Sequence, residues 1–529
     1  MNSRSSDWAS AVIRAISLLG LLVLPGSAVE PTVATDSGRV RGRTLNLADG
    51  GPATAFLGIP YAAAPTGSRR WKAPAPVEPW RGIRDSGHYG PWCEQAAASV
   101  PPEGISEDCL YINVWTPGDI RTNRMPVLVF IHGGGFAGAS ASHPYYRFGA
   151  LLRQGLVIVS FNYRLGVLGF LAHPELSRES PHRSSGNYAL LDQIAALRWT
   201  KRNIAKFGGD SEQITIMGDS AGAHAVACLL ASPLSQGLFQ RAVLNGPAMV
   251  VYPKPHFREL QRTGEAIFGR SVQELRAATP AELRKRLPPT GLNALKYAGF
   301  GPEMSFSPVV DGWVLPINPP EFSTKVQSRR TPVMVGAAVH EGDEWVLRNT
   351  FSMSDVSYKA YLGFRYGSHA SDILKRYPAI PSRPLKTTIS DLITDSIFLL
   401  SARGIADSLA RSGSPVFVYL FSYVSAHNRK RHRRAAHSDQ IPYLFGTVEQ
   451  LDPVEQADRD LSRVMMACLA NFVKTGSPHG SGTPVWPAYD LPARRYLEFG
   501  RDSTTRDKFF EEGSSVFQPW ISSADQSRR

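Results

Sequence analysis

The amino-acid sequence predicts an α/β protein whose central sheet is mostly parallel, with helices on both faces and helical insertions. Two observations predict this class. Continuous apolar runs such as residues 126–131 recur along the chain and are typical of strands that are buried on both faces of a parallel sheet. Helical patterns separate these runs, as expected where a crossover helix connects one strand to the next.

Residues 1–28 read as a secretory signal peptide. Arg4 and Arg14 are followed by an uncharged run at residues 15–29, which ends in small residues at the spacing of a cleavage site. A membrane anchor is the alternative, but fifteen residues interrupted by Pro25 fall short of the ~20 that span a bilayer. We therefore expect a secreted or periplasmic protein that has no integral membrane segment once the signal is removed.

Length alone favours two domains, since single cores usually stop growing at about 250–300 residues and this chain has 529. No linker, repeat or low-complexity segment divides the pattern of strands, however. Residues 250–300 and 350–412 look mainly helical and read as insertions. The sequence therefore predicts one domain over residues 29–529, after the signal peptide.

The chain is basic, with a formal net charge of +13, and it stays basic without its first 28 residues. Nucleic-acid binding is one implication of such a charge. No basic helix and no motif that interleaves aromatic with basic residues supports it, so we expect no nucleic-acid partner. The sequence leaves the oligomeric state open.

The cysteines divide into one expected disulfide and two buried thiols. Export permits a disulfide, and Cys93 and Cys109 lie 16 residues apart in a stretch rich in proline and glycine. Closing that loop should contribute about 3 kcal/mol to stability. Cys228 and Cys468 lie in helical patterns and are expected to behave as small buried hydrophobic residues.

The elements follow in chain order. Residues 36–61 alternate turn residues with short apolar runs, which suggests hairpin strands at a sheet edge. A helix is expected over residues 187–206, ending at Gly208 and Gly209. The other expected strands are residues 111–115, 126–131, 156–163, 214–217, 241–245, 333–339 and 416–423.

The sharp turn at residues 218–222, GDSAG, places Ser220 between a short strand and an alanine-rich helix. A serine at such a turn lies in strained backbone, and its hydroxyl is pushed out at the top of the sheet. Only glycine or a very small side chain fits at Gly218 and Gly222. The alternative is an ordinary glycine-rich turn, because the pattern fixes only three positions.

A glycine triplet at residues 133–135 directly follows the apolar run at residues 126–131 and His132. One interpretation is a tight turn that leaves a buried strand. The other is a set of free backbone N–H groups that can stabilise an oxyanion.

A serine nucleophile needs an adjacent histidine as base, and a carboxylate orients that histidine. In open α/β sheets the site lies outside the carboxyl ends of the strands, and Glu341 and His437 each follow an expected strand. Their order after Ser220 is the nucleophile, acid, histidine order of α/β-hydrolases. The histidines expected to serve only in packing or hydrogen bonding are His132, His224 and His340.

A more specific signal comes from ten ordered stretches: FLGIPYA (56–62), EDCLYINVW (107–115), HGGGF (132–136), NYRLGVLGF (162–170), GNYALLDQ (186–193), NIAKFGGD (203–210), GDSAGA (218–223), HEG (340–342), AAHSDQIPYLFG (435–446) and NFVKTGSP (471–478). They make the sequence resemble the type-B carboxylesterase family, which includes bacterial esterases and the cholinesterases, from about Thr35 to Tyr489.

The resemblance implies an α/β-hydrolase fold and a serine esterase that forms an acyl-enzyme on small-molecule esters, with neither a metal nor another cofactor. The implied catalytic triad is Ser220, Glu341 and His437. The N–H groups of the implied oxyanion hole belong to Gly134, Gly135 and Ala221, and one such donor is typically worth about 2.7–4 kcal/mol in the transition state.

The resemblance also implies structural pairs: the disulfide Cys93–Cys109 and the ion pairs Arg70–Glu107 and Arg164–Asp192. The sequence departs from the family at Asp219, where glutamate is more usual, so any help from this position to a cationic substrate is in doubt. A second disulfide of the animal relatives has no cysteines here.

Two other functions compete with the esterase. Some relatives of this fold have lost the serine and serve as binding or adhesion modules, but all three triad positions are present here. A lipase would need a mobile apolar lid, which the sequence does not reveal.

Residues 429–434 hold five fixed cations in six positions. A solvated loop is one interpretation. The other is steering of substrate, because the backbone of Arg434 must lie within roughly 10 Å of that of His437, about one Debye length. We expect Arg431, Arg433 and Arg434 to favour esters that carry carboxylates, such as the tricarballylate esters of fumonisin-type toxins that some relatives cleave.

Overall fold

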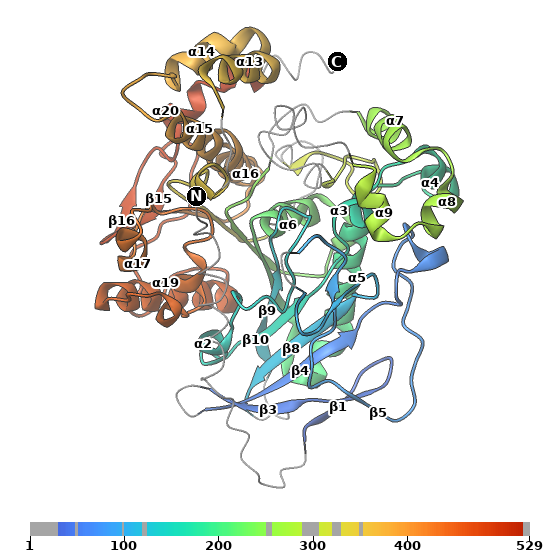
Figure 1. Cartoon of the computed structure of the whole chain (residues 1–529). Coiled ribbons are helices and arrows are strands. Elements are labelled where there is room, and N and C mark those ends of the chain that lie inside the picture. The colour runs from blue at the N-terminus through green and yellow to red at the C-terminus, as the bar shows by residue number, and fades with distance from the viewer. Residues whose placement is uncertain are drawn as a thin grey trace, which may run out of the picture.

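A computed structural model describes residues 30–47, 51–97, 100–118, 124–249, 256–287, 306–319, 330–348 and 353–521. Its centre is a twisted sheet with helices around it (Figure 1). The expected signal peptide lies outside the described residues. None of the described helices is long and apolar enough to cross a membrane.

The main sheet has eleven strands in the order β16-β15-β14-β13-β12-β11-β9-β10-β8-β4-β3. From β10 to β15 each neighbouring pair is parallel, whereas the pairs at both edges are antiparallel. Its strands are β3 (Arg43–Asn46), β4 (Pro52–Pro60), β8 (Tyr111–Pro117), β9 (Met125–Ile131), β10 (Val157–Phe161), β11 (Gly209–Asp219), β12 (Arg241–Asn245), β13 (Val333–Ala338), β14 (Val416–Phe421), β15 (Tyr496–Phe499) and β16 (Ser503–Arg506). The predicted α/β class is confirmed.

The apolar run of β9 shows why the central strands are parallel and covered. Successive side chains point to opposite faces of a sheet. Val127 and Val129 pack in one apolar cluster and Leu128 and Phe130 in another, and all four are fully buried. Both faces of the strand therefore need a helical cover, which antiparallel hairpins alone would not provide.

Helices cover both faces. The first cluster contains residues of α5 (Tyr188–Asn203), α6 (Ala221–Ala231) and α16 (Leu400–Arg411), and the second contains residues of α18 (Ile441–Leu444) and α19 (Gln456–Thr475). The short helices α2 (Gly149–Leu152) and α3 (Gly166–Phe170) also contribute to these clusters. Other short helices are α4 (Pro174–Glu179), α12 (Asp343–Arg348) and α17 (Ala426–Lys430).

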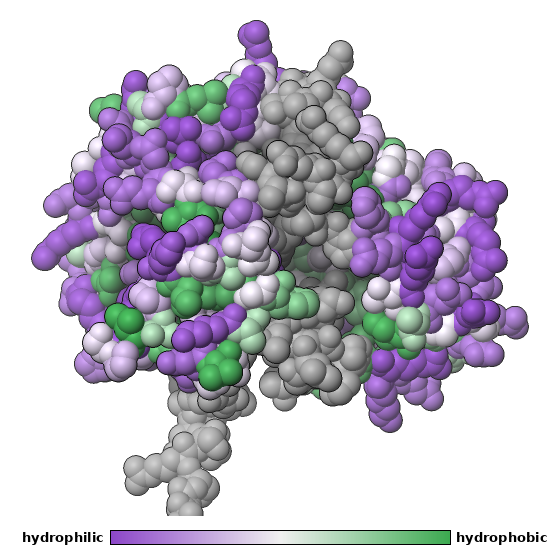
Figure 2. Space-filling view, turned by 90° about the horizontal axis from the view of Figure 1, so that it is seen from above, coloured by the Kyte–Doolittle hydropathy of each residue, from purple (hydrophilic) through white to green (hydrophobic). Residues whose placement is uncertain are grey.

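The two helical insertions flank the sheet on separate sides of Figure 1. One comprises α7 (Phe257–Phe268), α8 (Val272–Ala277) and α9 (Pro280–Lys285). The other comprises α13 (Asp355–Tyr366), α14 (Ala370–Arg376), α15 (Leu385–Ile393) and a π-helical segment at Thr394–Leu399, and packs with α20 (Glu511–Ser515) near the C-terminus. Seen from above, polar side chains cover both flanks, with apolar ones interspersed toward the middle (Figure 2).

The sequence patterns missed two strands of the main sheet, β15 and β16, and the short strands outside it, and they shifted some boundaries. β15 and β16 are four residues each, and half of their residues are only partly buried, so they carry no continuous apolar run. The N-terminal hairpin prediction was right in kind, but β1 (Thr32–Ala34) and β2 (Arg39–Arg41) form a separate small sheet with β5 (Ile83–Asp85). The short strands β6 (Trp92–Cys93) and β7 (Ile105–Ser106) pair beside the disulfide.

The expected structural pairs are present. Cys93 and Cys109 form a disulfide. Arg70 donates to both carboxylate oxygens of Glu107, and the Arg164–Asp192 ion pair is buried, with 4% and 0% of the side chains exposed. Both ion pairs are bidentate, a geometry that fixes orientation as well as charge.

The two remaining cysteines should be unreactive in the native protein. Cys228 and Cys468 are buried, and burial raises the pKa of Cys468 to about 12, so little reactive thiolate forms at neutral pH. We expect no thiol to titrate with a water-soluble aromatic disulfide before unfolding. Denatured protein should show two thiols without reductant and four after reduction. Rapid labelling of the native protein, or four thiols without reductant, would contradict the structure.

Candidate active site

A cavity of about 510 Å³ lies at the carboxyl ends of the central strands. Strands β9, β11, β13 and β14 end at residues 131, 219, 338 and 421, and the chain leaving these ends lines the cavity. Ser220 and His437 both lie in its wall, together with Gly134 and Gly135. The fold thus brings together segments that are more than 200 residues apart in sequence, at the edge where an α/β sheet places its ligands.

Ser220 occupies the turn between β11 and α6 in a strained conformation, with φ 58° and ψ −122°. The backbone N–H of Ser220 donates to Asn245 O at 2.8 Å, which ties the turn to β12. A Cβ atom on Gly218 would lie 2.1 Å from Gly222 O, and one on Gly222 would lie 2.1 Å from Ile131 O. The backbone segments around these two positions therefore approach too closely for any residue but glycine. The packed structure around the turn holds Ser220 in its strained conformation.

His437 forms a hydrogen-bonded ion pair with Glu341, through Nδ1 and Oε2. Glu341 is fully buried, and its other oxygen accepts a hydrogen bond from Ala338 N at 2.7 Å. Because a carboxylate can only accept, Nδ1 carries the proton, and Nε2 is left as the acceptor. The ring centroids of Trp345 and Phe398 lie 4.5 and 5.0 Å from the imidazole and hold its plane.

The charges around His437 favour its protonated form. Burial lowers the pKa of His437, but the charge and hydrogen bond of Glu341 and the charges of Asp219 and Glu344 outweigh it, so the pKa is raised above 6.5. No hydrogen bond joins Ser220 to His437 in the structure, although both face the same cavity. Such contacts commonly tighten only when substrate is bound.

Three backbone N–H groups near Ser220 have no acceptor among the described residues: those of Gly134, Gly135 and Ala221. Gly134 and Gly135 line the cavity, and Ala221 is the first residue of α6, where N–H groups have no partner within the helix. An anion forming beside Ser220 would find these donors unoccupied. The arrangement therefore suits an oxyanion.

Asp219 serves the architecture of the site. It is buried, and its carboxylate accepts hydrogen bonds from Asn245 Nδ2 at 2.6 Å and from Ser438 Oγ at 2.9 Å. Tyr145 OH donates to the carbonyl of Ser438 at 2.6 Å. These bonds hold Ser438, which has a positive φ of 64°, directly after His437. Asp219 thus connects the serine turn to the histidine loop.

His132, His224 and His340 lie in packing positions, as their sequence context predicted, whereas His143 and His427 line the cavity. His132 is buried, stacks on Tyr163 with ring centroids 4.4 Å apart, and has its pKa lowered to about 4 by burial. His224 packs edge-on against Phe136. His340 forms a bridge to Ala436. None of them lines the cavity.

The three arginines expected to steer substrate differ in their surroundings. Arg433 is exposed and lines the cavity, and its guanidinium has no hydrogen bond or ion pair among the described residues. Arg431 bonds to His427 and to the carbonyl of Asp452. Arg434 is drawn into ion pairs with Asp343 and Asp391 and does not line the cavity.

Sequence patterns did not reveal several residues that shape the site. Gly246 follows β12 with φ 58°, and a Cβ there would lie 3.2 Å from both Glu341 Oε1 and His437 Cε1. Tyr145 lies in a loop, Asn245 ends β12 and Trp345 lies in the short helix α12, so no periodicity marks their contacts with the site. In the described part of the chain, no group of three or more His, Cys, Asp or Glu side chains could hold a metal ion.

Comparisons with known proteins agree with this geometry. Residues 29–517 match the model of the carboxylesterase family. The chain is 35% identical over 493 residues to a fumonisin B1 esterase of Sphingopyxis macrogoltabida, covering 89% of this chain and 88% of that protein, and 32% identical to carboxylesterase 1C of Rattus norvegicus, covering 90% and 91%.

Solved structures are similar over the same length. A PNB esterase superposes with a TM-score of 0.78 at 30% identity, covering 93% of this chain and all of that one. A carboxylesterase of Geobacillus stearothermophilus gives the same TM-score and identity, with 92% and 100% covered. These likenesses extend beyond the site to the whole sheet.

Gly246→Ala should destabilise the protein, because the new methyl group meets the buried Glu341–His437 pair. Overpacking of this kind typically costs about 1–3 kcal/mol. The matched control is Gly155→Ala: Gly155 also has a positive φ, 73°, but nothing lies within 4 Å of the new Cβ. Thermal unfolding should show a larger drop in melting temperature for Gly246→Ala. Equal drops in melting temperature would mean that both substitutions cost only backbone strain, and that the Glu341–His437 pair moves aside for the new methyl group without cost.

Proposed function

The chain belongs to the carboxylesterase family and is a carboxylic ester hydrolase, and we propose that it works through an acyl-enzyme formed on Ser220, with His437 as base and Glu341 as its orienting acid. The observation that carries the proposal is the buried Glu341–His437 pair opening on the same cavity as the strained Ser220. A binding module would not need this pair.

In the proposed reaction Ser220 Oγ attacks the ester carbonyl while Nε2 of His437 takes the hydroxyl proton. Glu341 stabilises the resulting imidazolium, and the N–H groups of Gly134, Gly135 and Ala221 bind the oxyanion. His437 then gives its proton to the departing alcohol. A water molecule, deprotonated by His437, releases the acid from Ser220.

Export is also part of the proposal. The uncharged run after Arg14 supports it, and so does the Cys93–Cys109 disulfide, because such bonds persist mainly in oxidising compartments. The cut is proposed after residue 28, leaving residues 29–529 as the mature chain. A secreted or periplasmic esterase would meet small soluble esters from outside the cell.

For the substrate, we propose a preference for esters that carry a carboxylate. Arg433 supports this preference because it lines the cavity and its guanidinium forms no ion pair with any residue that the structure describes. Glu344 lines the same cavity with the opposite charge, so a substrate carboxylate would have to lie nearer to Arg433. The similarity to a fumonisin B1 esterase makes the tricarballylate esters of fumonisin-type toxins reasonable first candidates. Arg431 binds the carbonyl of Asp452 and Arg434 binds Asp343, so the proposal assigns the steering of substrate to Arg433 alone.

Ser220→Ala should lower the rate of hydrolysis of a simple aryl ester by more than about a thousandfold, since the base then has no nucleophile to activate. The fold should persist, because alanine fits the turn. Ser211→Ala, on the far end of the same strand, is the matched control and should keep full activity. If Ser220→Ala retains more than a few per cent of the wild-type rate, the proposed nucleophile is wrong.

Arg433→Gln should lower kcat/KM for a carboxylated ester by about two- to fivefold, the scale of one exposed charge interaction, and leave a neutral ester of similar size unchanged. The difference should shrink at high salt, where exposed charges are screened. Lys430→Gln removes an exposed charge from the same run and should affect neither ester. An equal loss for both esters, or a loss insensitive to salt, would exclude steering by Arg433.

A further inference from the structure

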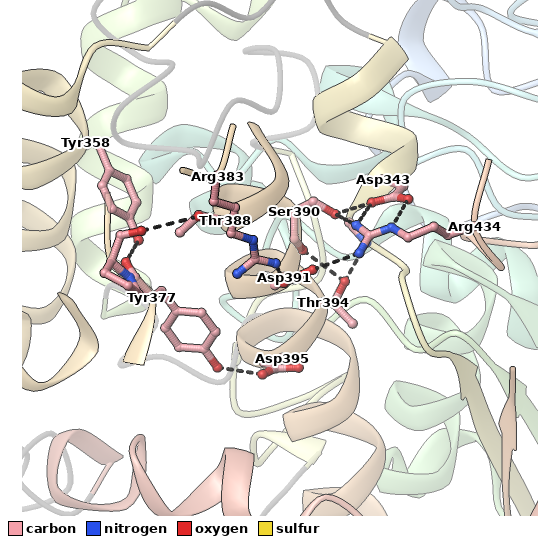
Figure 3. Close-up of polar contacts among 12 residues, drawn as sticks. Asp343, Tyr358, Tyr377, Arg383, Thr388, Ser390, Asp391, Thr394, Asp395 and Arg434 are labelled. Carbon is pink, nitrogen blue, oxygen red and sulfur yellow. Dashed lines mark hydrogen bonds and ion pairs between the residues drawn. The ribbon is translucent and has the colours of Figure 1, made fainter. Parts of the chain in front are cut away.

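Two loops carry the proposed acid and base, and a second ion pair joins them. Arg434 lies three residues before His437, and Asp343 lies two residues after Glu341. Arg434 binds Asp343 through both its Nε, at 2.9 Å, and a terminal nitrogen (Figure 3). The Arg434–Asp343 pair therefore joins the same two loops as the His437–Glu341 pair.

The two loops also meet through their backbones. The N–H of His340 donates to Ala435 O at 3.1 Å, and His340 and Ala436 form a parallel bridge. Glu341 and His437 each directly follow a residue of this bridge, whereas the second pair spans it, with Arg434 before Ala436 and Asp343 after His340. A short, rigid junction of this kind fixes where His437 stands relative to Glu341.

Helix α15 anchors the junction through polar contacts of Ser390 and Asp391, which Figure 3 shows beside Asp343 and Arg434. Ser390 donates to Asp343, and Asp391 contacts both Arg434 and Arg383. The first residue of the π-helical segment takes part as well: Thr394 Oγ1 accepts from the N–H of Gly342 at 2.9 Å and donates to Ser390 O. Thr394 thereby holds the residue directly after Glu341.

Because the Arg434–Asp343 ion pair is largely buried, each side chain needs the other to compensate its charge. The side chain of Asp343 is 6% exposed, and that of Arg434 is 32% exposed. Removing one partner of a buried pair leaves an uncompensated charge, which is far more disruptive than removing both. The planar guanidinium also matches the carboxylate in two places at once, which the ammonium of lysine cannot do.

We propose that Arg434 is a positioning residue, which with Asp343 and Asp391 holds the loop of His437 against the loop of Glu341. It acts through these loops, since neither Arg434 nor Asp343 lines the cavity. The assignment rests on the proposed roles of Glu341 and His437. It also gives a structural task to one of the cations in the basic run of residues 429–434.

The test compares Arg434→Gln, Arg434→Lys and the double variant Arg434→Gln/Asp343→Asn, with Lys430→Gln as the charge-matched control. Hydrolysis of a small neutral aryl ester is followed from acid to neutral pH. Because His437 must be neutral to act as base, kcat/KM falls as the pH drops through its pKa. Glu341, Asp219 and Glu344 together raise that pKa.

Arg434→Gln should lower kcat/KM by about 10- to 100-fold, the range expected when a reacting group is misplaced by about 1 Å. If the contact between Glu341 and His437 loosens, the carboxylate stabilises the protonated imidazole less and the pKa of His437 falls. The acid inflection of kcat/KM should therefore move to lower pH. Arg434→Lys and the double variant should each recover part of the rate, and Lys430→Gln should match the wild type in rate and inflection.

Two outcomes would overturn the proposal. A wild-type rate for Arg434→Gln would show that Arg434 positions nothing, and a lower rate with an unchanged acid inflection would show that the pair only stabilises the fold. If Arg434→Gln does not fold, the rate and the acid inflection of Arg434→Lys are compared with those of the wild type in its place. Failure of the proposed function is recognised separately, by activity that survives Ser220→Ala.

Discussion

The buried ion pair between Glu341 and His437 is the interaction around which this site is built. A fully buried carboxylate is costly unless hydrogen bonds and an opposite charge compensate it, and here Ala338 N and the imidazole do so. The compensation works only in one arrangement: Gly246 must lack a side chain, Trp345 and Phe398 must pack on the ring, and the two loops must stay in contact. The residues around the pair are therefore those that hold Glu341 and His437 in contact.

The parallel sheet supplies the frame for that pair. Because β9, β11, β13 and β14 run in the same direction, their carboxyl ends deliver the glycine triplet, Ser220, Glu341 and the chain leading to His437 to one edge. One insertion braces the site, because α15 and the π-helical segment contact the loop of Glu341 through Ser390 and Thr394. Asp219 braces the other side through Ser438.

Sequence patterns predicted the parts of this account that depend on local composition. Apolar runs marked the ends of β9, β10 and β14 to within two residues, and the GDSAG turn marked the strand-to-helix junction. Contacts between distant segments left no such mark: Gly246 is one glycine among 46, and its role follows only from what lies beside it. Arg434 shows the limit most clearly, since its sequence neighbours suggested a solvated cation or one that steers substrate, whereas Asp343, 91 positions earlier, binds it. β15 and β16, at one end of the sheet, escaped notice because they are short and only partly buried, so that they carry no continuous apolar run.

The most direct test of the central claim is to trap the nucleophile. An aryl phosphonate that carries a good leaving group reacts covalently with a serine activated by a neighbouring base, and peptide mass spectrometry locates the adduct. If Ser220 is the nucleophile that His437 activates, a single adduct should form, on Ser220, and far more slowly in His437→Gln. An adduct on another residue, or labelling of Ser220 at the wild-type rate in His437→Gln, would contradict that assignment.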